Sequence, residues 1–236
     1  GMRGMAGAIE KVAINAESRD VFYTTRGGGK PRGICGSGLV DALASLRVAG
    51  IVDQAGRMRV PGDGGDATPE FVIARARDTE IGKDITITQK DVRNLQLAKA
   101  AIFTGCSLLM KRMKVRACEL KDIFIAGAFG SYIDPVSAII IGMFPDVPLA
   151  KIKSIGNGAG FGARLALLSK SKGAEADEIA RRIHYVELSA EGDFQREFLK
   201  ALDLPHADGK LFPTATRIIE SGGKDLPKGA LGSGGA

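Results

Sequence analysis

Short apolar runs rich in β-branched and aromatic residues recur along this chain and predict strands. The expected strands cover residues 9–14, 21–25, 71–74, 85–88, 123–125, 152–155 and 185–188. Turn residues separate the first two runs, which predicts a hairpin, and the third and fourth runs form a second expected strand pair.

Apolar residues spaced three and four positions apart predict helices between these strands. The expected helices cover 38–47, a long segment after Thr88, a short segment from Asp134, a segment after Gly162, 174–182 and 193–202. Asp134-Pro135 is a typical helix start, because Asp caps the helix and Pro fits its first position.

The helix after Thr88 has the most regular pattern in the chain. Thr88 is expected to cap it, with Asp91 at the spacing of a capping box. Its apolar stripe comprises Val92, Leu95, Ile102, Cys106, Leu109 and Met113. The stripe predicts the face that packs on the core, and the other face carries Arg93, Gln96 and Lys99.

Strands and helices are interspersed along the chain, so the expected fold class is α/β, a mixed sheet flanked by helices. Residues 1–208 are expected to form the folded part. From Gly209 onward Gly, Lys, Pro and Ser become frequent, which predicts an extended or disordered tail over 209–236, with 229–236 disordered. The glycine-rich stretch from Pro61 to Asp66 is expected to be an exposed turn.

Composition narrows the classes of function. The net charge of +6 is spread along the chain, aromatic residues make up 6% and Trp is absent, so a surface that binds nucleic acid is not expected. Binding of an acidic partner protein by the positive charge remains an alternative. Cys35, Cys106 and Cys118 lack the spacing of a metal or cluster motif, and no metal site is expected. Without a signal peptide or a membrane-length apolar run, the expected location is the cytoplasm.

Three glycine-rich stretches are the candidates for chemistry, at residues 33–38, 125–130 and 156–162. The first and third lead into predicted helices, and the second follows a predicted strand. Glycine lets the backbone approach an anion closely, and a helix N-terminus offers unpaired N–H groups. Glycine also ends strands and caps helices, so it is their number that favours a nucleotide pocket.

Several segments together resemble the reductive activators of corrinoid proteins. The N-terminal part of the likeness comprises Gly-Met-Arg-Gly-Met-Ala-Gly-Ala-Ile-Glu at 1–10, Pro-Arg-Gly-Ile-Cys-Gly-Ser-Gly-Leu-Val-Asp at 31–41 and Leu-Gln-Leu-Ala-Lys-Ala-Ala-Ile at 95–102. Residues 125–130 and 155–160 are similar to the C-terminal ATPase-like domain of the same family. The likeness extends to about His206.

The resemblance implies an RNase H-like lobe of the acetate kinase, sugar kinase, heat-shock chaperone and actin superfamily, whose two lobes close on ATP with Mg²⁺. Members of the family pass an electron from an iron–sulfur cluster to an inactive cobalt(II) corrinoid, driven by ATP hydrolysis. The Asp-x-Gly phosphate loops and the [2Fe–2S] ferredoxin cysteines expected upstream are absent from this sequence. The chain is therefore expected to be a C-terminal fragment, inactive alone, that contributes one side of the nucleotide cleft.

The resemblance also suggests nucleotide-contacting residues. They are Gly127, Ala128, Phe129 and Gly130 at the adenosine, Gly36, Ser37 and Gly38 at a phosphate, Gly158 in the third stretch, and Gln96 with Lys99 at adenine and ribose. Structural alternatives stay open for each group. These are a tight turn at 127–130, an N-cap by Ser37, close helix packing at Gly158 and a solvated surface lysine at Lys99.

The expected partners are a corrinoid protein, nucleotide and a second copy of the chain, with neither nucleic acid nor membrane. Two alternatives to the nucleotide-binding lobe remain. The first is a non-catalytic module that dimerises and docks the corrinoid protein. The second is the ATPase of an acyl-CoA dehydratase activator, which belongs to the same superfamily.

Overall fold

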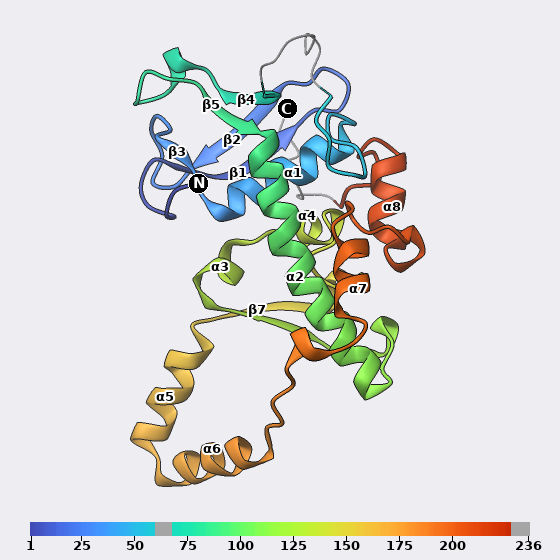
Figure 1. Cartoon of the computed structure of the whole chain (residues 1–236). Coiled ribbons are helices and arrows are strands. Elements are labelled where there is room, and N and C mark those ends of the chain that lie inside the picture. Colours follow the sequence, from blue (N-terminus) through green and yellow to red (C-terminus); the bar gives the residue numbers. More distant parts are fainter. Residues whose placement is uncertain (60–67, 228–236) are drawn as a thin grey trace.

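The structure is a computed structural model that describes residues 1–59 and 68–227, and of Ala128 and Phe129 the backbone alone. The exposed turn predicted at 61–66 and the disorder predicted at 229–236 lie outside the described residues. The described part contains strands and helices in alternation, which confirms the α/β class (Figure 1).

A three-stranded sheet forms the N-terminal part of the molecule. Its order is β2 (Val21–Thr25), β1 (Ala8–Ile14) and β3 (Gly33–Ile34), with β1 antiparallel to β2 and parallel to β3. The predicted hairpin is thereby confirmed. Helix α1 (Gly36–Val48) follows β3 directly and packs along β1.

The second strand pair leads into the longest helix. Strands β4 (Glu70–Ala74) and β5 (Ile85–Thr88) are antiparallel, and α2 (Gln89–Met113) begins where β5 ends. Thr88 Oγ1 accepts from the backbone N–H of Asp91, and the Asp91 carboxylate accepts from that of Thr88. The predicted capping box is therefore confirmed.

The C-terminal half is built around two parallel strands, β6 (Ile123–Ala126) and β7 (Ile152–Gly156). Short helices α3 (Gly127–Tyr132) and α4 (Pro135–Ile140) connect them, and Asp134 caps α4 as predicted. The chain continues through α5 (Gly158–Leu168), α6 (Lys170–Arg182), α7 (Phe194–Ala201) and α8 (Pro213–Glu220).

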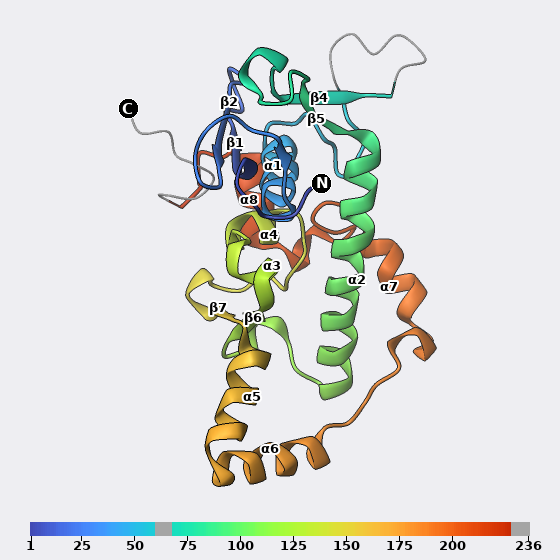
Figure 2. The same ribbon diagram turned by 90° about the vertical axis from the view of Figure 1, so that its left-hand side faces the viewer.

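One main core joins the N-terminal sheet to the helices beneath it. Ile9 of β1, Leu43 of α1, Ile140 of α4 and Ile218 of α8 are all buried in it, and Figure 2 shows α8 and α4 close to α1. Because α8 supplies buried side chains, the tail predicted from residue 209 does not hold for Pro213–Glu220. An apolar pattern that spans only about two turns is too short to identify a helix from the sequence.

Helix α2 buries a different face from the one its apolar stripe predicts. Of the stripe, Val92 is buried, but Ile102, Leu109 and Met113 are 39%, 42% and 73% exposed. The buried positions in the middle of the helix are Gln96, Lys99, Ala100, Phe103 and Thr104. Helix α7 packs along α2 and the chain that follows α7 returns to it, so tertiary contacts override the stripe.

Helices α5 and α6 extend away from the rest of the molecule in both ribbon views (Figures 1 and 2). Neither of these two fully described helices has a buried residue. The chain returns to α7 through 183–193, where the strand predicted at 185–188 is wrong: no described strand pairs with these residues. None of the described helices has the length and apolar character needed to cross a bilayer.

Candidate nucleotide-binding edge

Two of the three glycine-rich stretches lie at one edge of the β6–β7 pair. The strands are parallel, with Ala126 opposite Gly156, so their carboxyl ends point to the same side. Gly127 opens α3 directly after β6, and Gly156 ends β7 just before α5. In α/β proteins, ligands bind at the carboxyl ends of parallel strands, where helix N-termini present free N–H groups.

The two glycines at the strand ends have left-handed backbones, with φ of 89° at Gly127 and 60° at Gly156. Apart from the adjoining backbone, no heavy atom of the described structure would lie within 4 Å of a Cβ at either position. These glycines therefore set the direction of the chain without packing against anything in the described structure, and they leave space beside the backbone. A residue with a side chain would be strained at both positions.

The neighbouring glycines have packing roles. A Cβ at Gly130 would overlap the Ile125 side chain, and one at Gly158 would lie 3.2 Å from Cδ1 of Ile155. The Asn157 side chain caps α5 by accepting from the N–H of Gly160 at 3.0 Å. Close packing at Gly158, the structural alternative, is thus observed. A contact of Gly158 or Gly130 with nucleotide stays a prediction, as it does for Ala128 and Phe129.

The first glycine-rich stretch docks α1 onto β1. A Cβ at Gly38 would lie 2.5 Å from the carbonyl oxygen of Ile9, so only glycine allows this approach. The Ser37 hydroxyl is buried and donates to the carbonyl of Glu10 at 3.1 Å. The residue at the N-cap of α1 is Cys35, so the alternative that Ser37 caps the helix is wrong. Phosphate contact by Gly36, Ser37 and Gly38 stays a prediction.

Gln96 and Lys99 are buried, at 2% and 0% exposure, so the alternative of a solvated Lys99 is wrong. Gln96 Nε2 donates to the carbonyls of Leu202 at 2.7 Å and Ala55 at 3.2 Å. Lys99 Nζ donates to the carbonyls of Pro205 at 2.7 Å and Asp203. Burial lowers the pKa of Lys99 to about 7, and the charge of Asp203 opposes that shift. Contact of either side chain with nucleotide stays a prediction.

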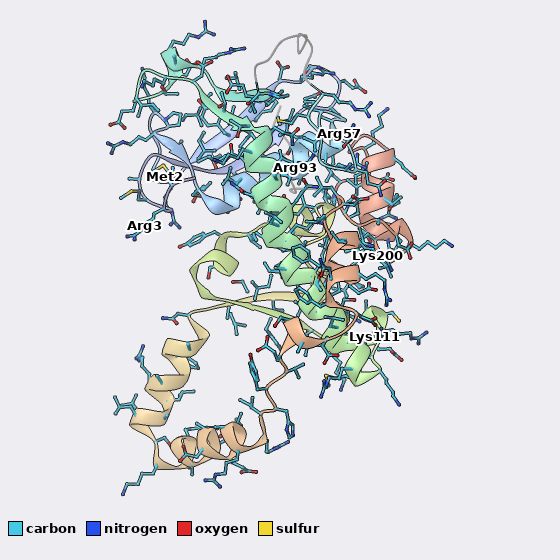
Figure 3. The ribbon with its side chains drawn as sticks, viewed as in Figure 1. Met2, Arg3, Arg57, Arg93, Lys111 and Lys200 are labelled. Atoms are coloured by element: carbon cyan, nitrogen blue, oxygen red, sulfur yellow. The ribbon has the colours of Figure 1, made fainter. Side chains whose placement is uncertain are left out.

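These two side chains belong to a larger set that holds the segment after α7. Carbonyls of the segment from Leu202 to His206 accept hydrogen bonds from side chains of other elements. The donors are Gln96, Lys99, Arg47 and Gln54. Arg93 of α2 donates to the carbonyl of Ala55 at 2.7 Å, the same carbonyl that Gln96 contacts. Figure 3 shows Arg93 on the upper part of α2, near the segment that carries Arg57.

A buried acid in α1 was not predicted from the sequence as a candidate residue. Asp41 of α1 is 4% exposed, and its Oδ1 has no hydrogen-bond partner among the described residues. Burial raises the pKa of Asp41 to about 7, the negative charge of Asp134 adds to the rise, and the Ser137 hydroxyl opposes it. The sequence signal was a single acid in the apolar run Leu39-Val40-Asp41-Ala42-Leu43.

The described residues do not form a site for a metal or a cluster. No group of three or more His, Cys, Asp or Glu side chains among them is arranged to hold a metal ion. Cys35 is buried at the start of α1, Cys106 lies in α2 and Cys118 is exposed after it. Three cysteines on separate elements do not fit the four-thiolate ligand set of a [2Fe–2S] cluster.

The profile of one protein family, described as the C-terminal domain of RACo, the ASKHA domain, matches residues 1–216. The chain belongs to this family. ASKHA denotes the acetate kinase, sugar kinase, heat-shock and actin superfamily, so the resemblance suggested by the sequence motifs is confirmed together with the fold class.

Two relatives of this RACo C-terminal domain have names that refer to corrinoids or corrinoid proteins. The corrinoid activation enzyme RamQ of Eubacterium limosum is 43% identical over 212 residues, which cover 84% of this chain and 35% of RamQ. The [Co(II) methylated amine-specific corrinoid protein] reductase of Methanosarcina barkeri is 27% identical over 151 residues, 64% of this chain and 25% of the reductase.

A solved structure has the same fold. The reductive activator for corrinoid, iron–sulfur protein superposes with a TM-score of 0.82 at 43% identity, over 90% of this chain and 35% of that protein. The chain therefore spans about a third of the length of RamQ and of this reductive activator.

Proposed function

We propose that this chain is the C-terminal nucleotide-binding part of an ATP-dependent reductive activator of corrinoid proteins. The observation that carries the proposal is the pair of open glycine turns, Gly127 and Gly156, at the carboxyl edge of β6–β7. The names of two relatives, a corrinoid activation enzyme and a reductive activator for corrinoid, iron–sulfur protein, support the reaction class.

The β6–β7 edge would form one side of a cleft for ATP and the Mg²⁺ that accompanies its phosphates. Backbone N–H groups at the starts of α3 and α5 would face the nucleotide, and the positive φ at both strand ends keeps side chains away from it. ATP hydrolysis and electron transfer are functions of a longer protein in this proposal, and the 236-residue chain by itself would bind nucleotide without turnover.

The electron carrier belongs to a different part of such a protein in this proposal. Because the described cysteines do not fit a [2Fe–2S] cluster, we assign no residue of this chain to it and no electron-transfer step. The corrinoid protein as partner, a homodimeric state and a cytoplasmic location complete the proposal. RamQ and the methylated amine-specific reductase are named for corrinoid proteins, which favours this function over acyl-CoA dehydratase activation.

Calorimetric titration with a non-hydrolysable ATP analogue and Mg²⁺ tests the proposal. We expect saturable binding to the chain, weakened in Gly156→Ala. Absence of heat up to millimolar analogue would overturn nucleotide binding by the 236-residue chain. It would favour the second candidate, a module that docks the corrinoid protein, for which the large exposed surface of α5 and α6 is the supporting observation.

A further inference from the structure

Helices α5 and α6 form an arm without a buried side chain, which we call the α5–α6 arm. The two helices contact each other and extend away from the other elements in both ribbon views (Figures 1 and 2). They have 11 and 13 residues, and none of these is buried. Helices of this length are barely stable alone in water and gain most of their stability by packing an apolar face. The arm therefore lacks, within the described structure, the surface that would stabilise it.

Large apolar side chains on the arm are exposed. Phe161, Leu165 and Leu168 of α5 follow one another at steps of four and three residues, so they share one face of the helix. Phe161 is 64% exposed and Leu168 is 77% exposed. Ile179 of α6 and Ile183 at its C-cap are one turn apart, at 51% and 68% exposure. Apolar side chains gathered on an exposed element mark a protein interface, and an interface of standard size uses about 20–30 residues of each partner. Two helices of 11 and 13 residues provide that number.

One side of α6 is open to a partner. Ala176, Ile179 and Ile183 follow the three- and four-residue steps of a row that packs against another helix. On one side of this row, a Cβ at Gly173 would lie 3.5 Å from the carbonyl oxygen of Ala166, so α5 lies against that side. The row itself and the side opposite Gly173 are exposed.

The open side of α6 carries two opposite charges. Glu175 and Arg182 are seven residues apart, which places both of them beside the apolar row on the side opposite Gly173. Glu175 Oε2 accepts from Lys172 Nζ of the same helix at 2.6 Å, an exposed pair that contributes little to stability. A helix that presents both signs on one flank, seven residues apart, has the charges needed to match a second copy of itself.

An antiparallel pair of α6 helices would satisfy both charges. In such a pair the same flank of both helices comes together. With Ile179 near the two-fold axis, Glu175 of each copy then faces Arg182 of the other copy. A parallel pair would instead place this flank against the side of Gly173 and Ala180, which offers no charge to match it. The charge pattern of α6 therefore favours a second copy of the chain, in antiparallel orientation, as the partner of the arm.

We propose that the α5–α6 arm is the interface between two copies of this chain, with the two α6 helices antiparallel about Ile179. The apolar face of α5 that contains Phe161 and Leu168 is covered by the second copy. This assigns a surface to the homodimer of the proposed function and rests on that part of it, whereas it does not require nucleotide. Only Asn157 separates Gly156 from α5, so the interface also holds the helix that begins at the β7 edge.

The primary test uses the charges, with sedimentation equilibrium of the 236-residue chain as the measurement. Wild type should form a reversible dimer. Glu175→Arg and Arg182→Glu each place like charges at both contacts, so each should weaken the dimer by at least about tenfold. An equimolar mixture of the two variants should restore association, because one copy then carries two positive charges on this flank and the other carries two negative charges. Asp177→Arg makes the same change of charge at an exposed position away from this flank and should leave the dimer intact.

A second variant tests the apolar part of the interface. Ile179→Asp puts a charge near the two-fold axis in both copies and should raise the dissociation constant of the dimer by at least about 100-fold. Ala174→Asp, on the far side of α6, is the control and should not change it. Three results would overturn the proposal: a wild-type chain that stays monomeric at the highest concentration measured, a dimer that Ile179→Asp leaves intact, or a mixture of the two charge variants that fails to associate.

Nucleotide binding is measured separately, by calorimetry with the ATP analogue, so that the two proposals fail independently. A chain that forms the predicted dimer without binding nucleotide would support the interface and overturn the nucleotide-binding function. A chain that binds nucleotide but stays monomeric would overturn the interface and support the nucleotide-binding function.

Discussion

Gly38 of the first glycine-rich stretch and the strand-end glycines of the other two, Gly127 and Gly156, have opposite surroundings. At Gly38 a Cβ would lie 2.5 Å from the backbone of Ile9, whereas at Gly127 and Gly156 it would have nothing within 4 Å. Gly38 brings a helix onto a strand, whereas Gly127 and Gly156 turn the chain at open strand ends. Other glycines of the same two stretches, Gly130 and Gly158, pack closely against Ile125 and Ile155. Glycine enrichment alone therefore does not distinguish a packing site from a ligand site.

The same division applies to the candidate side chains. Gln96 and Lys99 are enclosed and bonded to backbone carbonyls, as Ser37 is, so their polar groups already have partners. The turns at Gly127 and Gly156 offer backbone N–H groups beside open space. We therefore expect substitutions at the enclosed residues, such as Gly38 and Lys99, to change stability, and substitutions at the open turns to change nucleotide binding.

Gly38→Ala should have the largest effect on stability, because the clash is with backbone that cannot move aside. We expect a loss of about 3 kcal/mol in the free energy of unfolding. Urea denaturation measures it, with Gly162→Ala as the control, since a Cβ at Gly162 would contact nothing within 4 Å. A loss no greater than that of the control would contradict the packing role of the first stretch.

Lys99 should make stability depend on pH on the alkaline side. The folded pKa of about 7 lies below the ordinary lysine value of 10.5, so between these values the unfolded chain binds more protons and stability rises with pH. We expect a gain of roughly 1–2 kcal/mol over this window after allowance for solvent relaxation. The gain should vanish in Lys99→Met and persist in Lys90→Met, a change at an exposed position of the same helix.

The Lys99→Met variant also separates the two roles considered for this residue. If the amine serves only the carbonyls of Asp203 and Pro205, a folded variant should bind the ATP analogue as wild type does. Affinity that falls by more than about tenfold at unchanged fold would instead support a nucleotide contact.

Gly127→Ala and Gly156→Ala should affect binding more than stability. Each places a Cβ on a left-handed backbone, at a cost of about 1–2 kcal/mol in the free energy of unfolding. Because the same Cβ also occupies the open space at the strand end, we expect at least about a tenfold loss of affinity for the ATP analogue. Unchanged affinity in both variants, with the expected loss of stability, would remove these turns from the site.

Gly162→Ala should have the smallest effect, and of opposite sign. Gly162 lies inside α5 with an ordinary helical backbone and open space around it. Alanine there should raise stability by at most about 1 kcal/mol, the usual gain over glycine in a helix. Thermal unfolding measures the gain, and a loss of stability or affinity would show that Gly162 packs against something when nucleotide is bound.

Local chemistry made much of the fold predictable. The capping box at Thr88, the Asp134-Pro135 start of α4 and the hairpin of β1 and β2 each depend on residues close together in sequence. The family resemblance also came from the sequence, because motifs spread from residue 1 to about 206 had to agree. The strand ends at Gly127 and Gly156 were located correctly because each glycine directly follows a short segment of strand composition, Ile123–Ala126 and Ile152–Ile155.

The errors involve contacts between residues far apart in sequence. Lys99 was assigned to a polar face because the pattern of α2 by itself places it there, but the segment 202–206 returns and covers it. Residues 185–188 have strand composition yet no partner strand in the described structure. Asp41 appeared as one polar residue in an apolar helix, and its burial is visible only in the fold.

Most of the elements, several of their caps, the family and the positions of the glycine turns followed from the order of residues alone, since each depends on short-range geometry or on the order of motifs. Packing in three dimensions determined which turns are open and which are filled, and which polar groups are buried. Those properties depend on which distant segments pack together, and a helix or strand pattern contains no information about its neighbour. The candidate site is therefore defined by the parallel pairing of β6 and β7, which brings Gly127 and Gly156 to one edge.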